Sequence, residues 1–155
     1  MKKKVLFLCS GNSCRSQMAE GLLRHIDPGR YEVFSAGIRP TSVHPNAIKV
    51  MHEIGIDISE QFSKSVDQLG GRDFDIVVTV CDSLKEMCPV FASGARRIHW
   101  PFVDPAAATG TQEQILDVFR TVRDQIEERI TNEFGPGRLC PEISKRFNSN
   151  ERGWK

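Results

Sequence analysis

Short apolar runs alternate with segments of helical periodicity along the first part of the chain. Residues 5–8 form a continuous apolar run followed by small, turn-forming residues, which predicts a buried strand that enters a loop. In residues 16–26 the apolar positions recur at helical spacing, so a helix is expected directly after that loop. Residues 31–34 predict a second strand, and a second helix is expected to begin at Pro45 and to end before Gly55.

The same alternation continues through the second half. Residues 76–80 are β-branched and apolar on both faces, which is typical of a central parallel strand covered by helices on each side. Residues 97–100 are a weaker strand candidate, and residues 101–110 predict a loop. Residues 115–130 have one apolar and one charged face, which indicates a long helix. The alternation predicts an α/β fold, a doubly wound four-stranded parallel sheet flanked by four or five helices.

Size and charge narrow the class of protein. The 155 residues, 39% of them hydrophobic, fit a single domain at residues 1–134, followed by a tail at residues 135–155 that is either disordered or docked as a short helix from Pro141. The net charge of +1 lacks the footprint of a nucleic-acid binder. No apolar run approaches the roughly 20 residues that span a bilayer, and no secretion signal is recognised. We therefore expect a cytoplasmic monomer without nucleic-acid or membrane partners.

Cysteine usage adds the first hint of chemistry. An odd number of cysteines in a chain that needs no disulfides for stability argues against a secreted framework. In a reducing compartment, repeated cysteines are more often catalytic or metal-binding. The five positions are Cys9, Cys14, Cys81, Cys88 and Cys140.

The loop after the first predicted strand has the features of an oxyanion cradle. A loop of this length before a helix can turn successive backbone N–H groups inward, toward a tetrahedral anion. Cysteines in such electropositive settings ionise readily, so Cys9 is expected to be a nucleophilic thiolate. Arg15 can hold two anion oxygens at once, and Gly11 and Asn12 tolerate the positive φ of a tight loop. The predicted binding residues are Ser10, Gly11, Asn12, Ser13, Cys14, Arg15 and Ser16.

The same residues could also have a purely structural role, without binding an anion. Cys9 could be a buried cysteine at a strand end and Arg15 a surface residue, but the strand before and the helix after the loop favour the cradle. Cys14 is expected to pack the first helical turn, with a side disulfide to Cys9 as the minor alternative.

The motifs in combination resemble a known family. The loop, residues 16–20 and Asp104-Pro105 resemble the low-molecular-weight tyrosine phosphatases. The pair Cys81 and Cys88 is more similar to the redox branch of that family, the thioredoxin-coupled arsenate reductases, as are three short motifs. These motifs are Ser35-Ala36-Gly37, Asp57-Ile58-Ser59 and His99-Trp100. The resemblance covers about residues 4–130.

The reductase resemblance implies a three-cysteine relay. Cys9 attacks arsenate while Asp104 donates a proton to the departing hydroxide. Cys81 then attacks Cys9 and releases arsenite, and Cys88 attacks Cys81. Thioredoxin reduces the resulting disulfide, although a low-molecular-weight thiol is left open as the reductant. No cofactor is implied.

These residues have three further interpretations. A phosphatase would use Cys9, Arg15 and Asp104 alone, but alanines follow Asp104-Pro105 where aromatic side chains usually wall the pocket, and Tyr31 is the only tyrosine. Cys81 and Cys88 could be structural thiols, and a zinc site is disfavoured because the cysteine gaps do not match the usual spacing.

In a parallel sheet, Cys9, Cys81 and Asp104 each follow a strand and so converge at one edge.

The resemblance also bears on cations. Members of this branch that bind potassium use an asparagine, a glutamate, a serine and an aspartate; Asn12, Glu20 and Ser35 match, but Lys64 stands at the aspartate position. Our hypothesis is that the Lys64 ammonium takes the electrostatic role of the cation, with Asn12 steadied by Glu20 and Ser35. No metal site is predicted. Cys140 is expected to be a tail thiol outside the relay.

Overall fold

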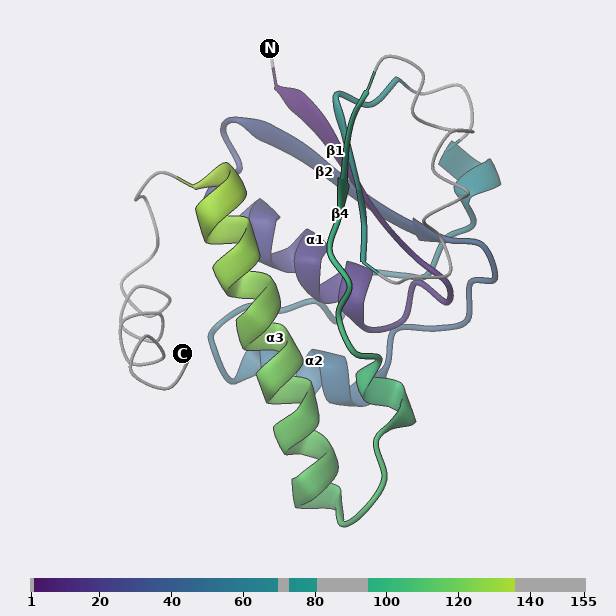
Figure 1. The fold of residues 1–155 in the computed structure, drawn as a ribbon, viewed down its shortest axis with the longest axis vertical. Coiled ribbons are helices and arrows are strands. Elements are labelled where there is room, and N and C mark those ends of the chain that lie inside the picture. Colours follow the sequence, from purple (N-terminus) through teal and green to yellow (C-terminus); the bar gives the residue numbers. More distant parts are fainter. Residues whose placement is uncertain (1, 70–72, 81–94, 136–155) are drawn as a thin grey trace.

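A computed structural model of the chain describes residues 2–69, 73–80 and 95–135, and the structural statements below concern these residues (Figure 1). The strands are β1 Lys3–Cys9, β2 Tyr31–Gly37, β3 Ile76–Thr79 and β4 Arg96–His99. The α-helices are α1 Arg15–Ile26, α2 Pro45–His52 and α3 Gln112–Phe134. Two short 3₁₀ helices are Val66–Leu69 and Pro105–Ala107.

The four strands form one parallel sheet in the order β2-β1-β3-β4. The central strand β1 pairs with β2 and β3, so that Phe7 lies opposite Ser35 on one side and Val78 on the other. Because all strands run in the same direction, the segments after β1 and β4 emerge at the same edge. This arrangement confirms the predicted α/β fold with a four-stranded parallel sheet.

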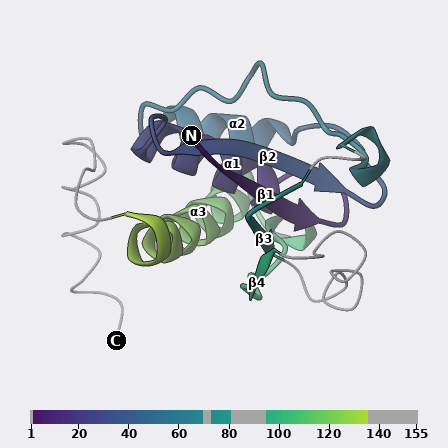
Figure 2. The same cartoon turned by 90° about the horizontal axis from the view of Figure 1, so that it is seen from above.

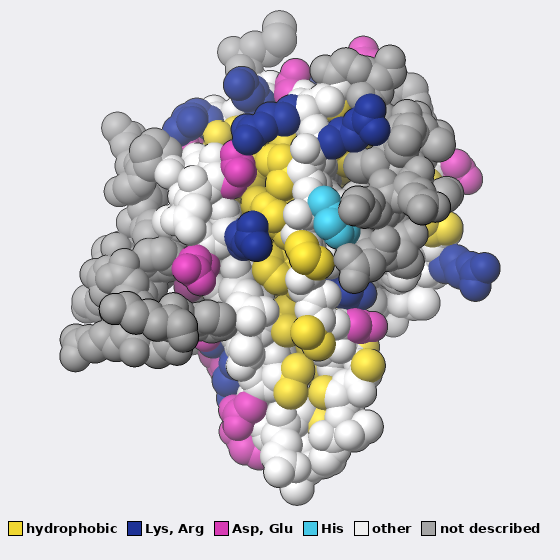
Figure 3. All heavy atoms as spheres, viewed as in Figure 1, with side chains coloured by type: hydrophobic (Ala, Val, Ile, Leu, Met, Phe, Trp, Pro, Cys, Tyr) yellow, Lys and Arg dark blue, Asp and Glu magenta, His cyan; other side chains and the backbone are white. Residues whose placement is uncertain are grey.

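An aromatic cluster joins the sheet to α3. The Phe7 ring lies 6.3 Å from that of Trp100 and 6.4 Å from that of Phe134, measured between centroids. The helix α3 packs against both α1 and α2, as the two ribbon views show (Figures 1 and 2). On the face viewed in Figure 3, hydrophobic side chains form a column in the area of α3 and β4, between charged and polar ones. Through this packing α3 supports α1, the helix that follows the loop after β1.

Local chemistry explains the ends of several elements. The helix α3 begins with a capping box, in which Thr111 and Gln114 satisfy each other's backbone N–H groups. Residues 101–110, predicted as a loop, contain the 3₁₀ helix Pro105–Ala107, because Asp104 caps it and the fixed φ of Pro105 favours a first helical position. The 3₁₀ helix Val66–Leu69 was not predicted either.

Some predictions fall on other parts of the chain. Cys81, Cys88 and the tail with Cys140 lie outside the described residues. Within the described ranges, no helix combines the length and apolarity that crossing a membrane requires.

Candidate active site

The loop between β1 and α1 is held from outside by the segment that follows β2. The carbonyl oxygen of Ser10 accepts the N–H of Arg39 at 2.9 Å, and that of Ser13 accepts the N–H of His44 at 3.1 Å. The Gly11 carbonyl is bound in the same way. No acceptor among the described residues engages the backbone N–H groups of residues 11–16. Three carbonyls of the loop are thus bound by the segment after β2, and the loop N–H groups, with the N-terminus of α1, are the candidate donors to an anion.

Asn12 is the most constrained residue of this loop. It is fully buried and adopts a left-handed φ of 49°, which asparagine tolerates better than most side chains. Its backbone oxygen accepts hydrogen bonds from Gln17 Nε2 at 3.1 Å and Ser63 Oγ at 2.6 Å. Its side-chain Oδ1 accepts the Lys64 N–H at 2.8 Å, and its Nδ2 donates to Ser16 Oγ at 2.8 Å. Asn12 therefore joins the loop to the segment at residues 63–64.

The Cys9 sulfur lies at the centre of this network. Cys9 is buried at the end of β1, and its Sγ lies 2.8 Å from Ser16 Oγ. Asn12 Nδ2 donates to the Ser16 oxygen, and the hydroxyl keeps its own hydrogen, so once Cys9 is ionised Ser16 is the donor of this contact. A donor in this position stabilises negative charge on the nucleophile.

Cys14, the second cysteine of the loop, has a different environment. Both thiols are free, and Cys14 packs in the hydrophobic core. Burial raises the pKa of Cys14 to about 12, against the lowering effect of its hydrogen bond with Ser13. Cys14 therefore stays protonated and serves packing rather than attack.

Arg15 and Asp104 meet at the same edge of the sheet. The Arg15 side chain, 11% exposed, donates to the Phe102 carbonyl at 3.1 Å, and its Nη2 lies 3.7 Å from Asp104 Oδ2. Asp104 is 48% exposed, and its Oδ1 accepts the Ala106 N–H at 3.0 Å. The structure therefore places Arg15 beside Asp104, with Cys9 at the end of β1 on the same edge of the sheet, whereas Cys81 and Cys88 lie outside its described part.

Gly37 has a structural role next to the loop that the sequence analysis did not assign to it. A Cβ atom at Gly37 would lie 2.6 Å from the Ser10 oxygen, 2.8 Å from the Asn12 nitrogen and 2.9 Å from the Cys9 oxygen. The end of β2 thus approaches the loop so closely that a side chain is excluded. In the sequence Gly37 belongs to the motif Ser35-Ala36-Gly37, which carried the resemblance but assigned no role to the glycine.

Gly37→Ala is expected to distort the oxyanion loop. The clash is with backbone rather than with a flexible side chain, so unfolding free energy should fall by about 1–3 kcal/mol and phosphate binding should weaken with it. Gly29→Ala is the matched control, because a Cβ atom at Gly29 would lie 3.8 Å from Asp27 Oδ1, an ordinary van der Waals distance. Denaturant unfolding and phosphate titration calorimetry measure both effects; equal behaviour of the two variants would contradict the account.

The residues that match the potassium ligands of the family are paired with cationic side chains in this chain. Glu20 is buried, accepts a hydrogen bond from Ser35 Oγ, and pairs with Arg24 Nη2 at 2.7 Å. The Lys64 Nζ lies 3.8 Å from Glu20 Oε1, where an ammonium already supplies positive charge. Burial lowers the pKa of Lys64, while Glu20 acts in the opposite direction. A potassium ion does not fit beside this ammonium.

One part of the cation hypothesis needs correction. Asn12 is held by the Lys64 N–H, and its backbone oxygen by Gln17 and Ser63, rather than by Glu20 and Ser35. Ser35 and Glu20 instead bond to each other, because the strand β2 places Ser35 against α1.

Exchange of potassium for sodium at equal ionic strength should leave both the thermal midpoint and the turnover rate unchanged. The reason is that the Glu20 carboxylate already has Lys64 and Arg24 as partners. Differential scanning fluorimetry and a steady-state assay in the two salts test this. A large gain specific to potassium would show that a cation site exists in spite of Lys64.

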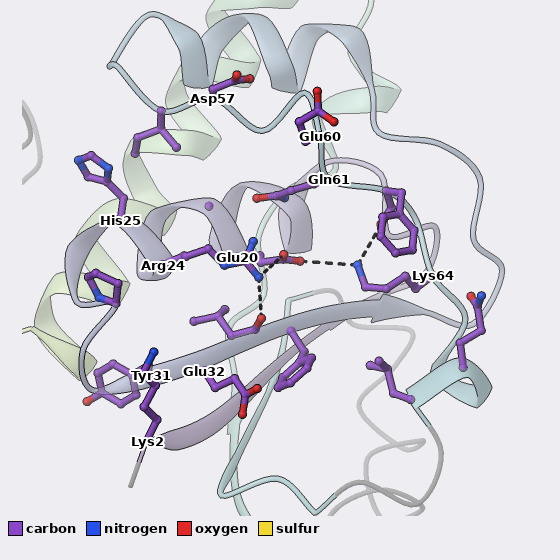
Figure 4. A pocket seen from close by; sticks show the side chains of 18 of the residues that line it. Lys2, Glu20, Arg24, His25, Tyr31, Glu32, Asp57, Glu60, Gln61 and Lys64 are labelled. Carbon is purple, nitrogen blue, oxygen red and sulfur yellow. Dashed lines mark hydrogen bonds and ion pairs between the residues drawn. The ribbon is translucent and has the colours of Figure 1, made fainter.

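A large hollow lies elsewhere. It has a volume of about 960 Å³, runs between α1 and β2, and is lined in part by Glu20, Arg24 and Lys64 (Figure 4). Neither Cys9 nor Asp104 lines it. The candidate active site is therefore identified by the residues of the loop and not by the volume of this hollow.

Comparisons with known proteins agree with this geometry. The family model for low molecular weight phosphotyrosine protein phosphatase matches residues 4–142. An arsenate reductase of Halalkalibacterium halodurans is 52% identical over 129 residues, which cover 83% of this chain and 93% of that protein. A solved arsenate reductase in the phosphate-binding state has 41% identity and a TM-score of 0.74, covering 84% of this chain and 95% of that one.

A more distant structure is a thioredoxin-dependent arsenate reductase of Corynebacterium glutamicum. It has 27% identity and a TM-score of 0.61, and the match covers 84% of this chain and 61% of that one. Because the family model spans nearly the whole described chain and the first relative aligns over more than four fifths of it, the protein belongs to the low-molecular-weight phosphotyrosine protein phosphatase family.

Proposed function

We propose that this protein is an arsenate reductase that converts arsenate to arsenite with electrons from its own thiols. The observation that carries the proposal is the loop of residues 10–16, whose carbonyls at Ser10, Gly11 and Ser13 are bound from outside and whose buried Cys9 sulfur lies 2.8 Å from the Ser16 hydroxyl. Arsenate has the shape and charge that such a loop accepts. The relative from Halalkalibacterium halodurans, which is 52% identical to this chain, is named arsenate reductase, and this supports the choice of oxyanion.

The first step forms a bond between sulfur and arsenic. The Cys9 sulfur attacks arsenic, an arsenic–oxygen bond breaks, and the departing hydroxide takes a proton from Asp104 and leaves as water. Arg15 holds two of the remaining oxygens in its planar fork once it turns from the Phe102 carbonyl toward the anion. The arsenic is still pentavalent in this adduct.

The next steps move two electrons to arsenic. The Cys81 thiolate attacks the Cys9 sulfur, the sulfur–arsenic bond breaks, and its electron pair stays on arsenic, so that trivalent arsenite leaves and a Cys9–Cys81 disulfide remains. Cys88 then attacks Cys81 and releases Cys9 as a thiolate. A dithiol reductant reduces the Cys81–Cys88 disulfide; the name of the Corynebacterium glutamicum relative supports thioredoxin. Because such a cycle needs a compartment that keeps thiols reduced, we place it in the cytoplasm.

Phosphoester hydrolysis is the second candidate, since the same loop and acid would serve it. The surroundings of Asp104 favour the reductase. Ala106 and Ala107 are small and exposed, so they offer no wall for an aryl group. Tyr31 begins β2 at the opposite end from the loop, and its hydroxyl donates to the Phe134 carbonyl at 3.4 Å.

One pair of assays separates the two functions. Arsenate-dependent NADPH consumption is measured with thioredoxin and thioredoxin reductase, with glutathione and glutaredoxin as the alternative reductant, beside hydrolysis of p-nitrophenyl phosphate. We expect rapid arsenate reduction with thioredoxin and slow hydrolysis. Hydrolysis without arsenate reduction would establish the phosphatase, and binding without either activity would indicate an oxyanion-binding module.

Asp104→Asn is expected to slow arsenate reduction by roughly 10² to 10⁴, the usual contribution of a general acid. Asparagine caps a helix about as well as aspartate, so the 3₁₀ helix after Asp104 should persist and phosphate affinity should change little. Single-turnover kinetics and phosphate calorimetry measure the two effects. Unchanged turnover would mean that Asp104 only caps the turn.

A further inference from the structure

A buried ion pair lies behind the oxyanion loop, on the side of the large hollow. The Lys64 side chain is 13% exposed, and its Nζ lies 3.8 Å from Glu20 Oε1. The same ammonium donates to the Phe62 carbonyl at 2.9 Å and lies 4.6 Å from the centroid of the Phe62 ring. Figure 4 shows Glu20 and Lys64 pointing toward each other across the hollow. Three contacts thus fix the end of the lysine side chain.

Glu20 is itself an immobile partner. It projects from α1, accepts a hydrogen bond from Ser35 of β2, and pairs with Arg24 one helical turn away. Its carboxylate is almost fully buried. The charge that attracts Lys64 is therefore attached to both the helix and the sheet.

The backbone of Lys64 contacts the loop directly. Its N–H donates to Asn12 Oδ1 at 2.8 Å, and its carbonyl accepts the N–H of Gly37 at 2.8 Å. An N–H group can only donate, so this bond requires the oxygen of the Asn12 amide to face Lys64 and its Nδ2 to face Ser16. Ser16 in turn lies 2.8 Å from the Cys9 sulfur.

We infer that Lys64 is a positioning residue for the nucleophile. Its ammonium, held by Glu20, keeps the Lys64 backbone in place; that backbone orients the Asn12 amide, and through Ser16 the amide directs a hydrogen bond onto the Cys9 sulfur. The inference rests on the proposed function only in taking Cys9 as the reacting group. The Lys64 side chain lies outside the loop and is linked to Cys9 through Asn12 and Ser16. The inference assigns to this side chain a role in the reactivity of the Cys9 thiol.

The test compares Cys9 alkylation in three variants of the full-length protein. Lys64→Met removes the ammonium and keeps an apolar chain, Lys64→Arg restores a cation, and Lys49→Met removes one charge from an exposed position on α2. Iodoacetamide labelling is followed across a pH series, with fragment-ion mapping to separate Cys9 from Cys14. Thermal midpoints are recorded in parallel.

We expect Lys64→Met to slow Cys9 alkylation at neutral pH about tenfold and to move its pH profile upward, as weakening of a hydrogen bond to a charged group would do. Lys64→Arg should restore most of the rate, and Lys49→Met should match the wild type. A lowered thermal midpoint with an unchanged Cys9 profile would show a purely structural ion pair and overturn the inference. If Lys64→Met does not fold, Glu20→Gln removes the same attraction, and the same two outcomes decide.

The alkylation experiment is independent of arsenate. Failure of the wild type to reduce arsenate would refute the proposed function and leave the comparison of Cys9 profiles valid. Conversely, active reduction with an identical Cys9 profile in Lys64→Met and wild type would refute the positioning role alone.

Discussion

Cys9→Ser is expected to abolish arsenate reduction while leaving phosphate binding largely intact. A serine hydroxyl stays protonated at neutral pH and cannot form the sulfur–arsenic bond or the disulfide that follows it. In the proposed site the anion is bound by backbone N–H groups of the loop. The loop carbonyls are held by residues 39–44, and this support does not involve the sulfur. Reduction should fall to the background rate in the NADPH assay, with phosphate affinity measured by calorimetry.

Cys140→Ser is the control for that substitution. It also replaces one thiol by a hydroxyl, but at a position that the proposed relay does not use, so its turnover should equal that of the wild type. Arsenate reduction that persists in Cys9→Ser would remove Cys9 from the mechanism.

Cys88→Ala should release one arsenite per enzyme molecule and then stop. Without Cys88 nothing resolves the Cys9–Cys81 disulfide, so the oxidised enzyme accumulates in that form. Cys81→Ala should stop earlier, before arsenite leaves, because no second sulfur attacks Cys9. Quantification of arsenite after a single turnover, with peptide mapping of disulfides, distinguishes these states.

The relay prediction fails on either of two results. Multiple turnovers of Cys88→Ala with thioredoxin would show that Cys88 is dispensable. Oxidised wild-type protein without a Cys81–Cys88 disulfide would show that the oxidising equivalent does not reach this pair. The prediction comes from the sequence and its resemblance, since both cysteines lie outside the described residues.

The sequence by itself determined the elements and their order. The apolar run before Cys9, the helical period after it and the apolar run at residues 76–80 are local patterns. Each corresponds to an element in the structure, the last of them to β3, which ends at Thr79. The same holds for the loop residues, because small residues and an arginine between a strand and a helix are adjacent in the chain. Local periodicity and turn preference are properties of short segments, so they can be read without knowledge of the fold.

Only the tertiary structure decided how the loop is held. Gly37 lies against the Cys9 loop because β1 and β2 pair in one particular register, with Cys9 opposite Gly37. Asn12 bonds to the backbone of Lys64, whereas the matching residue types had suggested Glu20 and Ser35. These contacts join segments that are far apart in the chain. They depend on the strand register and on interatomic distances that must be right to a few tenths of an ångström. Neither quantity is expressed in the local pattern of residue types, which is why the support of the nucleophile became visible only in three dimensions.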